Sequence, residues 1–267
     1  MNFTKKKPAI LSLQYHSYPD AVGGAWNLTH EINRRLVKRG YRVVIITCKP
    51  SNDYPDQEVI NGVEFIRIEY AVSKHPMRLW SAIRKKVKNY MNEPENWVAH
   101  VHHPLVGAFA LTEKRYRKIP KIYHFHSSWY DEERINEIGT ESTEVSIKLK
   151  TKLQLIRVME GVGYAMSRTL FFLSEYSKNR FLKYYTFTKP DLCVIPGGVN
   201  VDEFQPPTSR EAINSIREKL KLSTAIPLLL TVRRLEQRMG LENLVRAAGI
   251  LNRRAPDLKF QLVITGK

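Results

Sequence analysis

The sequence predicts an α/β fold built around an open, mostly parallel β-sheet, and two observations support this. Short apolar runs rich in β-branched and aromatic residues alternate with longer segments of helical spacing. Several of these runs are apolar on both faces, as strands of a parallel sheet covered by helices on each side must be. In such a doubly wound sheet ligands bind beyond the carboxyl ends of the strands, so functional residues are expected just after strands.

Strands are predicted at residues 9–14, 42–47, 63–68, 97–102, 121–126, 169–174, 192–196, 228–232 and 260–266. Between the first two, an apolar period near 3.6 predicts a helix that ends at Gly40, because glycine is favoured just after a helix. A longer helix is expected from about Thr143 to Ser167, as scaffold.

The composition of the sequence changes after Phe204, where a proline-containing linker precedes a predicted polar helix. We therefore predict a first domain at residues 1–204, followed at 205–267 by a linker and the beginning of a second α/β domain. About 60 residues with two or three strands cannot bury both faces of their own sheet. The sequence is therefore expected to be part of a longer protein.

Forty-three Lys and Arg against 26 Asp and Glu give a net charge of +17, which favours phosphate-bearing partners. Nucleic acid is not predicted as a partner and stays a minor alternative, because no helix-turn-helix, zinc-finger spacing or RNP-like pattern occurs. The two cysteines, Cys48 and Cys193, stand in no CxxC spacing, which favours a reducing compartment and a cytoplasmic location. No apolar run approaches the roughly 18 residues of a membrane span.

Two strand-to-helix loops are candidate anion sites. Gly23 and Gly24 stand at the mouth of the first predicted helix, where free N–H groups favour an anion such as a diphosphate, although a tight turn without ligand explains them as well. Arg233, Arg234 and Arg238 crowd a loop near the end of the chain. Arginine suits phosphate because it stays charged and donates several hydrogen bonds.

Five histidines gather at the ends of two neighbouring predicted strands: His100, His102, His103, His124 and His126. Alternate positions share a face, but no Asp, Glu or Cys joins them at ligand spacing, so no metal site is predicted. His126 leads directly into a loop, a position suited to substrate contact. Residues 75–91 predict a basic amphipathic helix, which makes an anionic membrane surface, the inner face of a membrane, a candidate partner beside the alternative of an ordinary surface helix.

In this order the motifs "GGAWNLTHEINRRLVKRGYRVVIIT", "HFHSSWYDE", "LSEYSKNRFLKYY", "VIPGGVNVDEF", "TVRRLEQRMGLENLVRAA" and "LVITGK" resemble the GT-B glycosyltransferases of retaining family 4, nearly end to end. The resemblance implies two Rossmann-like domains, acceptor-side first, and transfer of a sugar from a nucleotide-sugar donor to a hydroxyl acceptor with retention. It also implies no cofactor and no obligatory metal. "VIPGGVNVDEF" resembles the family's "VIPNGVDxxxF", where the first domain ends.

The resemblance assigns residues as well. Gly23 and Gly24 match the family's glycine loop near the donor phosphates. His126 matches the histidine that borders the donor sugar, and Arg234 matches the arginine of "GRL", which binds the donor diphosphate. Both are therefore predicted as catalytic.

Four further residues are predicted to bind the donor from the same alignment. Gly197 and Gly198 lie where the family's backbone approaches the ligand. The family lysine falls on Met239, so Arg238, with Arg233, is expected to supply the missing cation.

The family's acidic pair, Glu-x7-Glu, has no counterpart in these residues, so little activity is expected from them alone. Two alternatives remain open. One is a nonenzymatic membrane- or glycan-binding module, and the other is a GT-B-fold nucleotide-sugar epimerase, which would form product without an acceptor.

Overall fold

The structure is a computed structural model that describes residues 7–91, 93–111, 113–116, 118–138, 146–186 and 190–266. The chain divides into two compact units, which we describe separately. The first unit contains the residues up to Tyr130 together with Ile147–Gly198. The second contains Asp131–Ser146 and the residues from Val199 onward.

The first unit is built on one twisted sheet with the strand order β3-β4-β2-β1-β5-β6-β7-β8. Neighbouring strands are parallel except for β3, which pairs antiparallel with β4 at the sheet edge. Its elements, in chain order, are β1 (Ala9–Leu13), α1 (Gly24–Lys38), β2 (Val43–Cys48), β3 (Gln57–Ile60), β4 (Val63–Ile68), α2 (Tyr70–Ser73), α3 (Pro76–Tyr90), β5 (Trp97–Val101), α4 (Pro104–Leu111), β6 (Lys121–Phe125), α6 (Ile147–Ala165), β7 (Thr169–Phe172), α7 (Glu175–Leu182) and β8 (Asp191–Val194). The helix α5 (Trp129–Ile138) follows β6.

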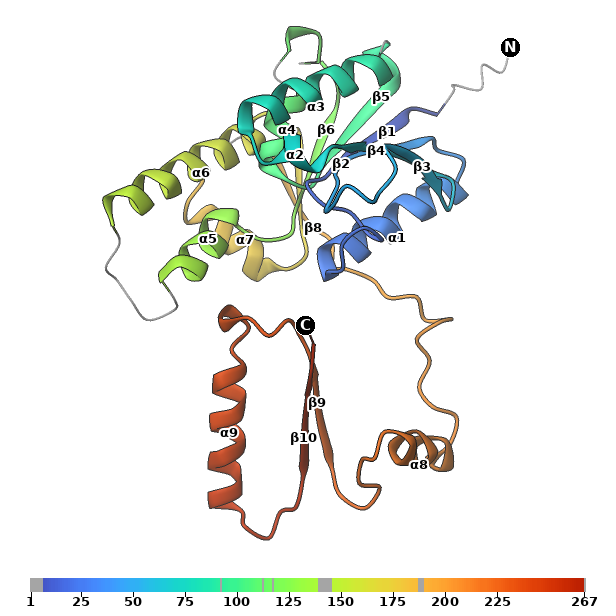
Figure 1. The fold of residues 1–267 in the computed structure, drawn as a ribbon, viewed down its shortest axis with the longest axis vertical. Helices are drawn as coiled ribbons and strands as arrows, with labels where there is room; N and C mark the ends of the chain where they lie inside the picture. The colour runs from blue at the N-terminus through green and yellow to red at the C-terminus, as the bar shows by residue number, and fades with distance from the viewer. Residues whose placement is uncertain are drawn as a thin grey trace. The chain divides into compact units, whose positions relative to one another are not determined.

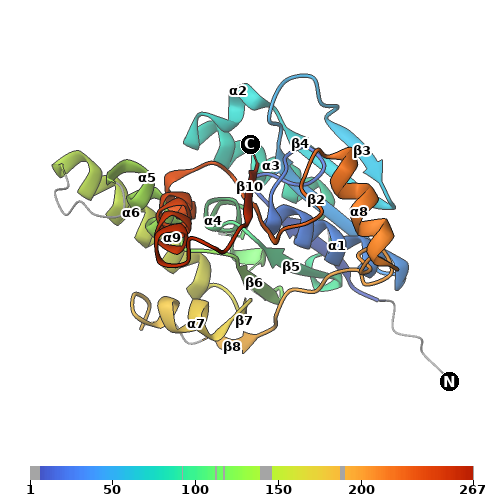
Figure 2. The same ribbon diagram turned by 90° about the horizontal axis from the view of Figure 1, so that it is seen from below.

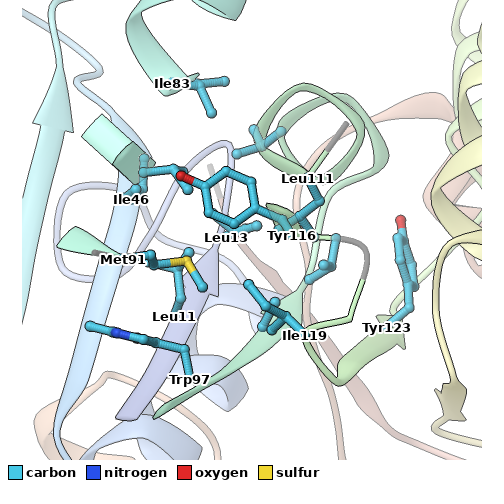
Figure 3. Close-up of a cluster of buried hydrophobic side chains, with 14 of the residues drawn as sticks. Leu11, Leu13, Ile46, Ile83, Met91, Trp97, Leu111, Tyr116, Ile119 and Tyr123 are labelled. Carbon is cyan, nitrogen blue, oxygen red and sulfur yellow. The ribbon is translucent and has the colours of Figure 1, made fainter. Parts of the chain in front are cut away.

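Helices cover both faces of this sheet, as the doubly apolar strands predict (Figure 1). The larger core lies under α3, α4 and α6, and Leu11 and Leu13 of β1 belong to the same buried cluster as Ile83 of α3 (Figure 3). A smaller core beneath α1 contains Ile45 and Phe65. Burial of these side chains is the main stabilising term of the unit.

All nine predicted strands are present. The strand β3 was not predicted, although its signal is in the sequence: Asn61-Gly62 between two short extended runs. Asn61 (φ 52°) and Gly62 (φ 80°) form a two-residue turn that pairs Ile60 with Val63. A positive φ at both turn residues is what joins two antiparallel strands with the correct twist.

The helix α1 buries a polar stripe rather than only the apolar stripe that its sequence displays. Thr29, His30 and Asn33 are its buried residues, whereas Trp26 and Leu28 are only partly buried. Asn33 donates to the Ser12 hydroxyl on β1 at 3.3 Å. The sheet face under this helix is therefore polar near the strand ends.

The second unit contains α8 (Arg210–Lys219), β9 (Leu228–Val232), α9 (Leu241–Arg254) and β10 (Gln261–Thr265). The strands β9 and β10 pair in parallel, and Figures 1 and 2 place them between α9 and α8. Ser209 caps α8 by accepting from the Ala212 N–H, and Gly240 (φ 70°) precedes α9 in the left-handed region.

Within the described residues, no helix has the length and apolar content needed to cross a membrane. The predicted basic amphipathic helix is α3, and its apolar residues Leu79, Ile83 and Val87 are all buried against the sheet. Its apolar face is therefore occupied by the protein's own core.

Candidate functional site

The strand order reverses at β1, which makes the carboxyl ends of β1 and β5 the expected ligand position of the first unit. From β1 the chain proceeds to β2 on one side, while β5 lies on the other. The His102 N–H donates to the Leu13 carbonyl at 2.9 Å, so the two strand exits remain adjacent. The predicted glycine loop and the histidine group follow these two strands.

The glycine loop ends in a helix start that is open to a ligand. The helix α1 begins at Gly24, and Gly23 occupies the N-cap position without a side-chain cap. A Cβ atom at Gly24 would meet none of the described atoms within 4 Å, whereas one at Gly23 would come within 2.8 Å of the Trp26 ring. Among the described residues no side chain caps this helix start, and backbone N–H groups in such a position suit an anion.

A buried ion pair holds the loop that carries these glycines. Arg67 of β4 donates from Nε and Nη2 to the two carboxylate oxygens of Asp20, at 2.6 and 2.8 Å, and both side chains are 1% exposed. Arg67 also pairs with Glu58 at 2.8 Å. A bidentate contact of this kind fixes orientation as well as distance, so Asp20 positions the loop three residues before Gly23.

Aromatic rings and imidazoles form the rim of this edge. His16 lies edge-on to Trp26, with ring centroids 5.7 Å apart. His103 lies 5.2 Å from the Tyr15 ring and 5.2 Å from the Trp129 ring. Ring faces of this sort suit the apolar faces of a sugar or a nucleobase.

His126 is joined to α1 through His102. His102 Nδ1 lies 3.1 Å from His126 Nε2 and 3.3 Å from the Thr29 hydroxyl. Burial, reinforced by the neighbouring His124 and His100, lowers the pKa of His126 to about 3. His126 is therefore neutral near pH 7 and acts as a hydrogen-bonding group.

The loop after His126 is held by a buried carboxylate, Glu160 of α6. Its Oε1 accepts from the Trp129 N–H at 2.7 Å and from the Tyr164 hydroxyl at 3.0 Å, and Oε2 accepts from the Tyr185 hydroxyl. Burial raises the pKa of Glu160, although the donated hydrogen bonds act in the opposite direction. Glu160 is thus a positioning residue for the segment that carries His126.

The segment after β8 runs back toward α1. Ile195 donates to the Phe172 carbonyl at 2.8 Å, and a Cβ atom at Gly197 would lie 3.7 Å from the Leu28 side chain. A Cβ atom at Gly198 would meet none of the described atoms within 4 Å. The structure therefore brings Gly197 next to the helix that begins at Gly24, and leaves Gly198 uncovered.

In the second unit, two of the three predicted arginines converge. Arg234 Nη1 lies 3.0 Å from Glu236 Oε1, and Arg238 Nε lies 2.9 Å from Glu236 Oε2. Arg238 also pairs with Glu132 at 3.0 Å, within the same unit. Arg233 turns away, and its guanidinium donates to the Met239 carbonyl at 3.3 Å. The Glu236 carboxylate thus lies between the Arg234 and Arg238 guanidinium groups.

Three positioning residues were missed from the sequence: Thr29, Arg67 and Glu160. Glu160 had a signal, because it is a lone carboxylate within the apolar run "LIRVMEGVGYAM". Arg67 also interrupts an apolar run, in "VEFIRI". Thr29 carried no signal, since its role depends on which face of α1 is buried. The roles assigned to the predicted site residues themselves stay predictions.

Comparison with known proteins supports the fold. In solved structures, the chain is similar to sucrose-phosphate synthase from Thermosynechococcus elongatus, with a TM-score of 0.70 and 18% identity over 96% of this chain and 62% of the other. It is also similar to WaaG, a glycosyltransferase involved in lipopolysaccharide biosynthesis, with a TM-score of 0.65 and 18% identity over 97% of this chain and 64% of the other. The fold is therefore of the GT-B glycosyltransferase type, as predicted.

The curated relatives found by sequence have names of the same kind as these structural neighbours. The chain is 24% identical over 256 residues to a D-inositol 3-phosphate glycosyltransferase of Nocardiopsis dassonvillei, a match that covers 91% of this chain and 56% of the relative. It is 26% identical over 230 residues to a probable sucrose-phosphate synthase of Thermosipho melanesiensis, covering 79% of this chain and 52% of the relative. The chain spans about half the length of these curated relatives.

The family model for Glycosyltransferase Family 4 matches residues 22–203. The match begins at the glycine loop and ends after the segment with Gly197 and Gly198, so it covers both glycine pairs and the histidines of β5 and β6. The chain therefore belongs to Glycosyltransferase Family 4.

Proposed function

We propose that the protein is a glycosyltransferase that moves a sugar from a nucleotide-sugar donor to a hydroxyl acceptor with retention, in polysaccharide, glycolipid or glycoconjugate synthesis. The family match over residues 22–203 is the observation that carries the proposal. The names of two relatives, a D-inositol 3-phosphate glycosyltransferase and a sucrose-phosphate synthase, describe the same class of enzyme. The open helix start at Gly24 and the neutral His126 supply groups of the kind that such a reaction needs.

Each unit has its own role in this proposal. In the first unit, backbone N–H groups near Gly23 and Gly24 bind phosphate or acceptor oxygens, and His126 hydrogen-bonds the donor sugar. In the second, Arg234 and Arg238 release Glu236 and bind the leaving diphosphate, whose negative charge grows as the sugar–phosphate bond breaks. Preorganised cations stabilise that charge most effectively, so we propose that no metal is obligatory for the transfer.

Calorimetric titration of the chain with a panel of UDP-, GDP- and ADP-sugars tests the proposal. We expect one member to bind, the binding to survive EDTA, and Arg234→Ala to abolish most of it. Binding is the primary readout, because little turnover is expected from these residues alone. Where product forms, the NMR coupling of its anomeric proton reports whether configuration is retained. If no nucleotide sugar of the panel binds, the proposal fails.

A second partner is supported by charge. The exposed side of α3 carries Lys85 and Lys88, and the whole chain has a net charge of +17. We propose that the protein associates with an anionic membrane surface, the inner face of a membrane, through these charges. Because Leu79, Ile83 and Val87 are buried in the core, this association is electrostatic and does not insert the helix into lipid.

A further inference from the structure

The histidines of β5 and β6 gather on one face of the sheet, the face that α1 partly covers. His100 and His102 are alternate residues of one strand and its exit, and His124 lies on the neighbouring strand. Val101 pairs with Tyr123, so His102 and His124, the next residues, lie across from each other. One ring nitrogen from each of His100, His102 and His124 falls within a group whose members all lie within 4.8 Å of one another.

These imidazoles are buried without protein partners for several of their nitrogens. His100 is 8% exposed and His124 is 5% exposed. The buried Nε2 atoms of His100 and His102, and both ring nitrogens of His124, have no hydrogen-bond partner among the described residues. A buried polar atom without a partner costs roughly 1–3 kcal/mol, so a cluster of them points to a ligand that satisfies several at once.

His102 Nδ1 has two polar neighbours. The Thr29 hydroxyl donates to the Ala25 carbonyl at 2.8 Å, so toward His102 Nδ1, 3.3 Å away, its oxygen is available as an acceptor, and His126 Nε2 lies 3.1 Å from the same Nδ1. In the tautomer that carries the proton on Nδ1, the buried Nε2 of His102 presents a lone pair. This is the arrangement of a metal-binding histidine, whose other nitrogen donates to a supporting group.

We propose that His100, His102 and His124 form a binding site for a divalent late transition metal ion, with Zn²⁺ the ion that their ligand set fits. Three imidazoles and an open position suit Zn²⁺, which takes His nitrogens at about 2.0–2.1 Å in tetrahedral geometry. Ligand nitrogens in such a site are about 3.4 Å apart, so the three nitrogens, which lie within 4.8 Å of one another, have to move closer together around the ion. Mg²⁺ and Ca²⁺ are excluded as occupants, because the three residues offer no oxygen ligands.

The site departs from the sequence-based prediction of no metal. That prediction weighed the histidines of both strands and followed from the lack of an Asp, Glu or Cys at ligand spacing, whereas three imidazoles are enough for the site proposed here. The proposal is also independent of the transferase proposal, because no step of sugar transfer is assigned to the ion.

Titration of untagged, chelator-treated protein with Zn²⁺, in competition with a chromophoric chelator, tests the site. We expect one Zn²⁺ per chain, a rise in melting temperature with Zn²⁺ but not with Mg²⁺, and intense visible absorption of the Co²⁺ form, as four-coordinate Co²⁺ gives. His124→Phe, which keeps the ring but removes the nitrogens, is expected to weaken binding at least tenfold. Thr29→Val is expected to weaken it about tenfold through loss of the supporting hydroxyl.

The exposed His75 provides the matched control, and His75→Phe is expected to leave affinity unchanged. Absence of stoichiometric binding by the wild-type chain would overturn the proposal, as would equal affinity in His124→Phe. Should His124→Phe fail to fold, pulsed EPR of the wild-type Cu²⁺ form counts the bound imidazoles, and fewer than three overturns the proposal. A chain that binds Zn²⁺ but no nucleotide sugar would support this site and contradict the transferase proposal alone.

Discussion

At the scale of single residues, Gly24 and Gly198 are glycines with room for a side chain. A methyl group at either position would meet none of the described atoms within 4 Å, so packing against the described residues does not require glycine there. Gly24 is the first residue of α1, where alanine is as compatible with a helix as glycine or more so. If a ligand approaches this backbone closely, the added methyl occupies the ligand's space.

We therefore expect Gly24→Ala to leave the free energy of unfolding unchanged or slightly increased, while weakening nucleotide-sugar binding at least tenfold. Gly107→Ala is the structural control, because its Cβ would lie 2.4 Å from a Val101 methyl group. That variant is expected to lose about 1–3 kcal/mol of stability through overpacking. Urea unfolding and calorimetric titration of both variants separate the two effects, and unchanged ligand binding in Gly24→Ala would refute the close approach.

Arg234 and Arg238 both contact Glu236, so substitutions at these positions test whether the arginines bind a diphosphate. Arg238→Ala removes one charge-assisted donor and is expected to weaken nucleoside diphosphate binding by about 10- to 100-fold. Arg233→Ala is expected to have a smaller effect, because that guanidinium faces the Met239 carbonyl. Glu236→Gln is expected to tighten binding, since the diphosphate no longer competes with a carboxylate. Titrations with UDP and GDP measure all three, and full affinity in Arg238→Ala would rule out its assignment as the missing cation.

The raised pKa of Glu160 predicts a pH dependence of stability. The folded state holds the proton of this carboxyl more tightly than the unfolded chain, where the pKa is near 4.5. The contribution of Glu160 to stability is therefore most favourable below pH 4.5 and decreases as pH rises through the folded-state pKa. Relative to Glu160→Gln, the wild-type chain should thus lose free energy of unfolding between pH 4.5 and neutral pH. Urea unfolding at several pH values gives this difference, and a difference that is flat or rises with pH would contradict the assignment.

At the scale of elements, the ion pair between Asp20 and Arg67 joins the glycine loop to β4. Removing one member of a buried pair leaves a buried charge and typically costs about 3–5 kcal/mol. Asp20→Ala is therefore expected to lose that amount, whereas the double variant Asp20→Ala/Arg67→Met should lose less than the two single variants added together. Urea unfolding of the four proteins of this cycle gives the coupling free energy. Additive losses would show that the pair does not hold the loop.

The elements also show what a single sequence can predict. Nine strands were predictable because each is a short, nearly continuous apolar run, as in "RVVIIT", the pattern of a parallel strand that helices cover on both faces. The edge strand β3 is exposed over most of its length and has no such run. The Asn61-Gly62 turn that follows it is therefore its signal in the sequence. The rotation of α1, which buries Thr29 and Asn33, could not be predicted, because its polar partners come from other strands.

At the scale of the whole molecule, the fold follows from the order of the apolar runs, while the site follows from strand pairing. The glycine loop and the histidines at the end of β5 are about 75 residues apart in the sequence. They lie close together because β1 is placed between β2 and β5 in the sheet. Local sequence patterns predicted His126 and the glycines as separate site residues. They could not predict that Thr29 and His102 link His126 to the helix that begins at Gly24, since those contacts depend on the order of the strands in the sheet.

The net charge of +17 predicts that the molecule binds anionic membrane surfaces. We expect the chain to co-float with vesicles that contain anionic lipid and not with neutral vesicles. Because the apolar face of α3 is buried, salt should release the protein: the screening length falls from about 10 Å at 0.1 M salt to about 3 Å at 1 M. Charge reversal at Lys85, Lys86 and Lys88 should weaken binding more than the same reversal at Lys219, Lys221 and Lys259, which changes the net charge equally. Binding that persists in 1 M salt would mean that an apolar surface inserts into lipid, and equal losses in the two variants would mean that no single face of the molecule contacts the membrane.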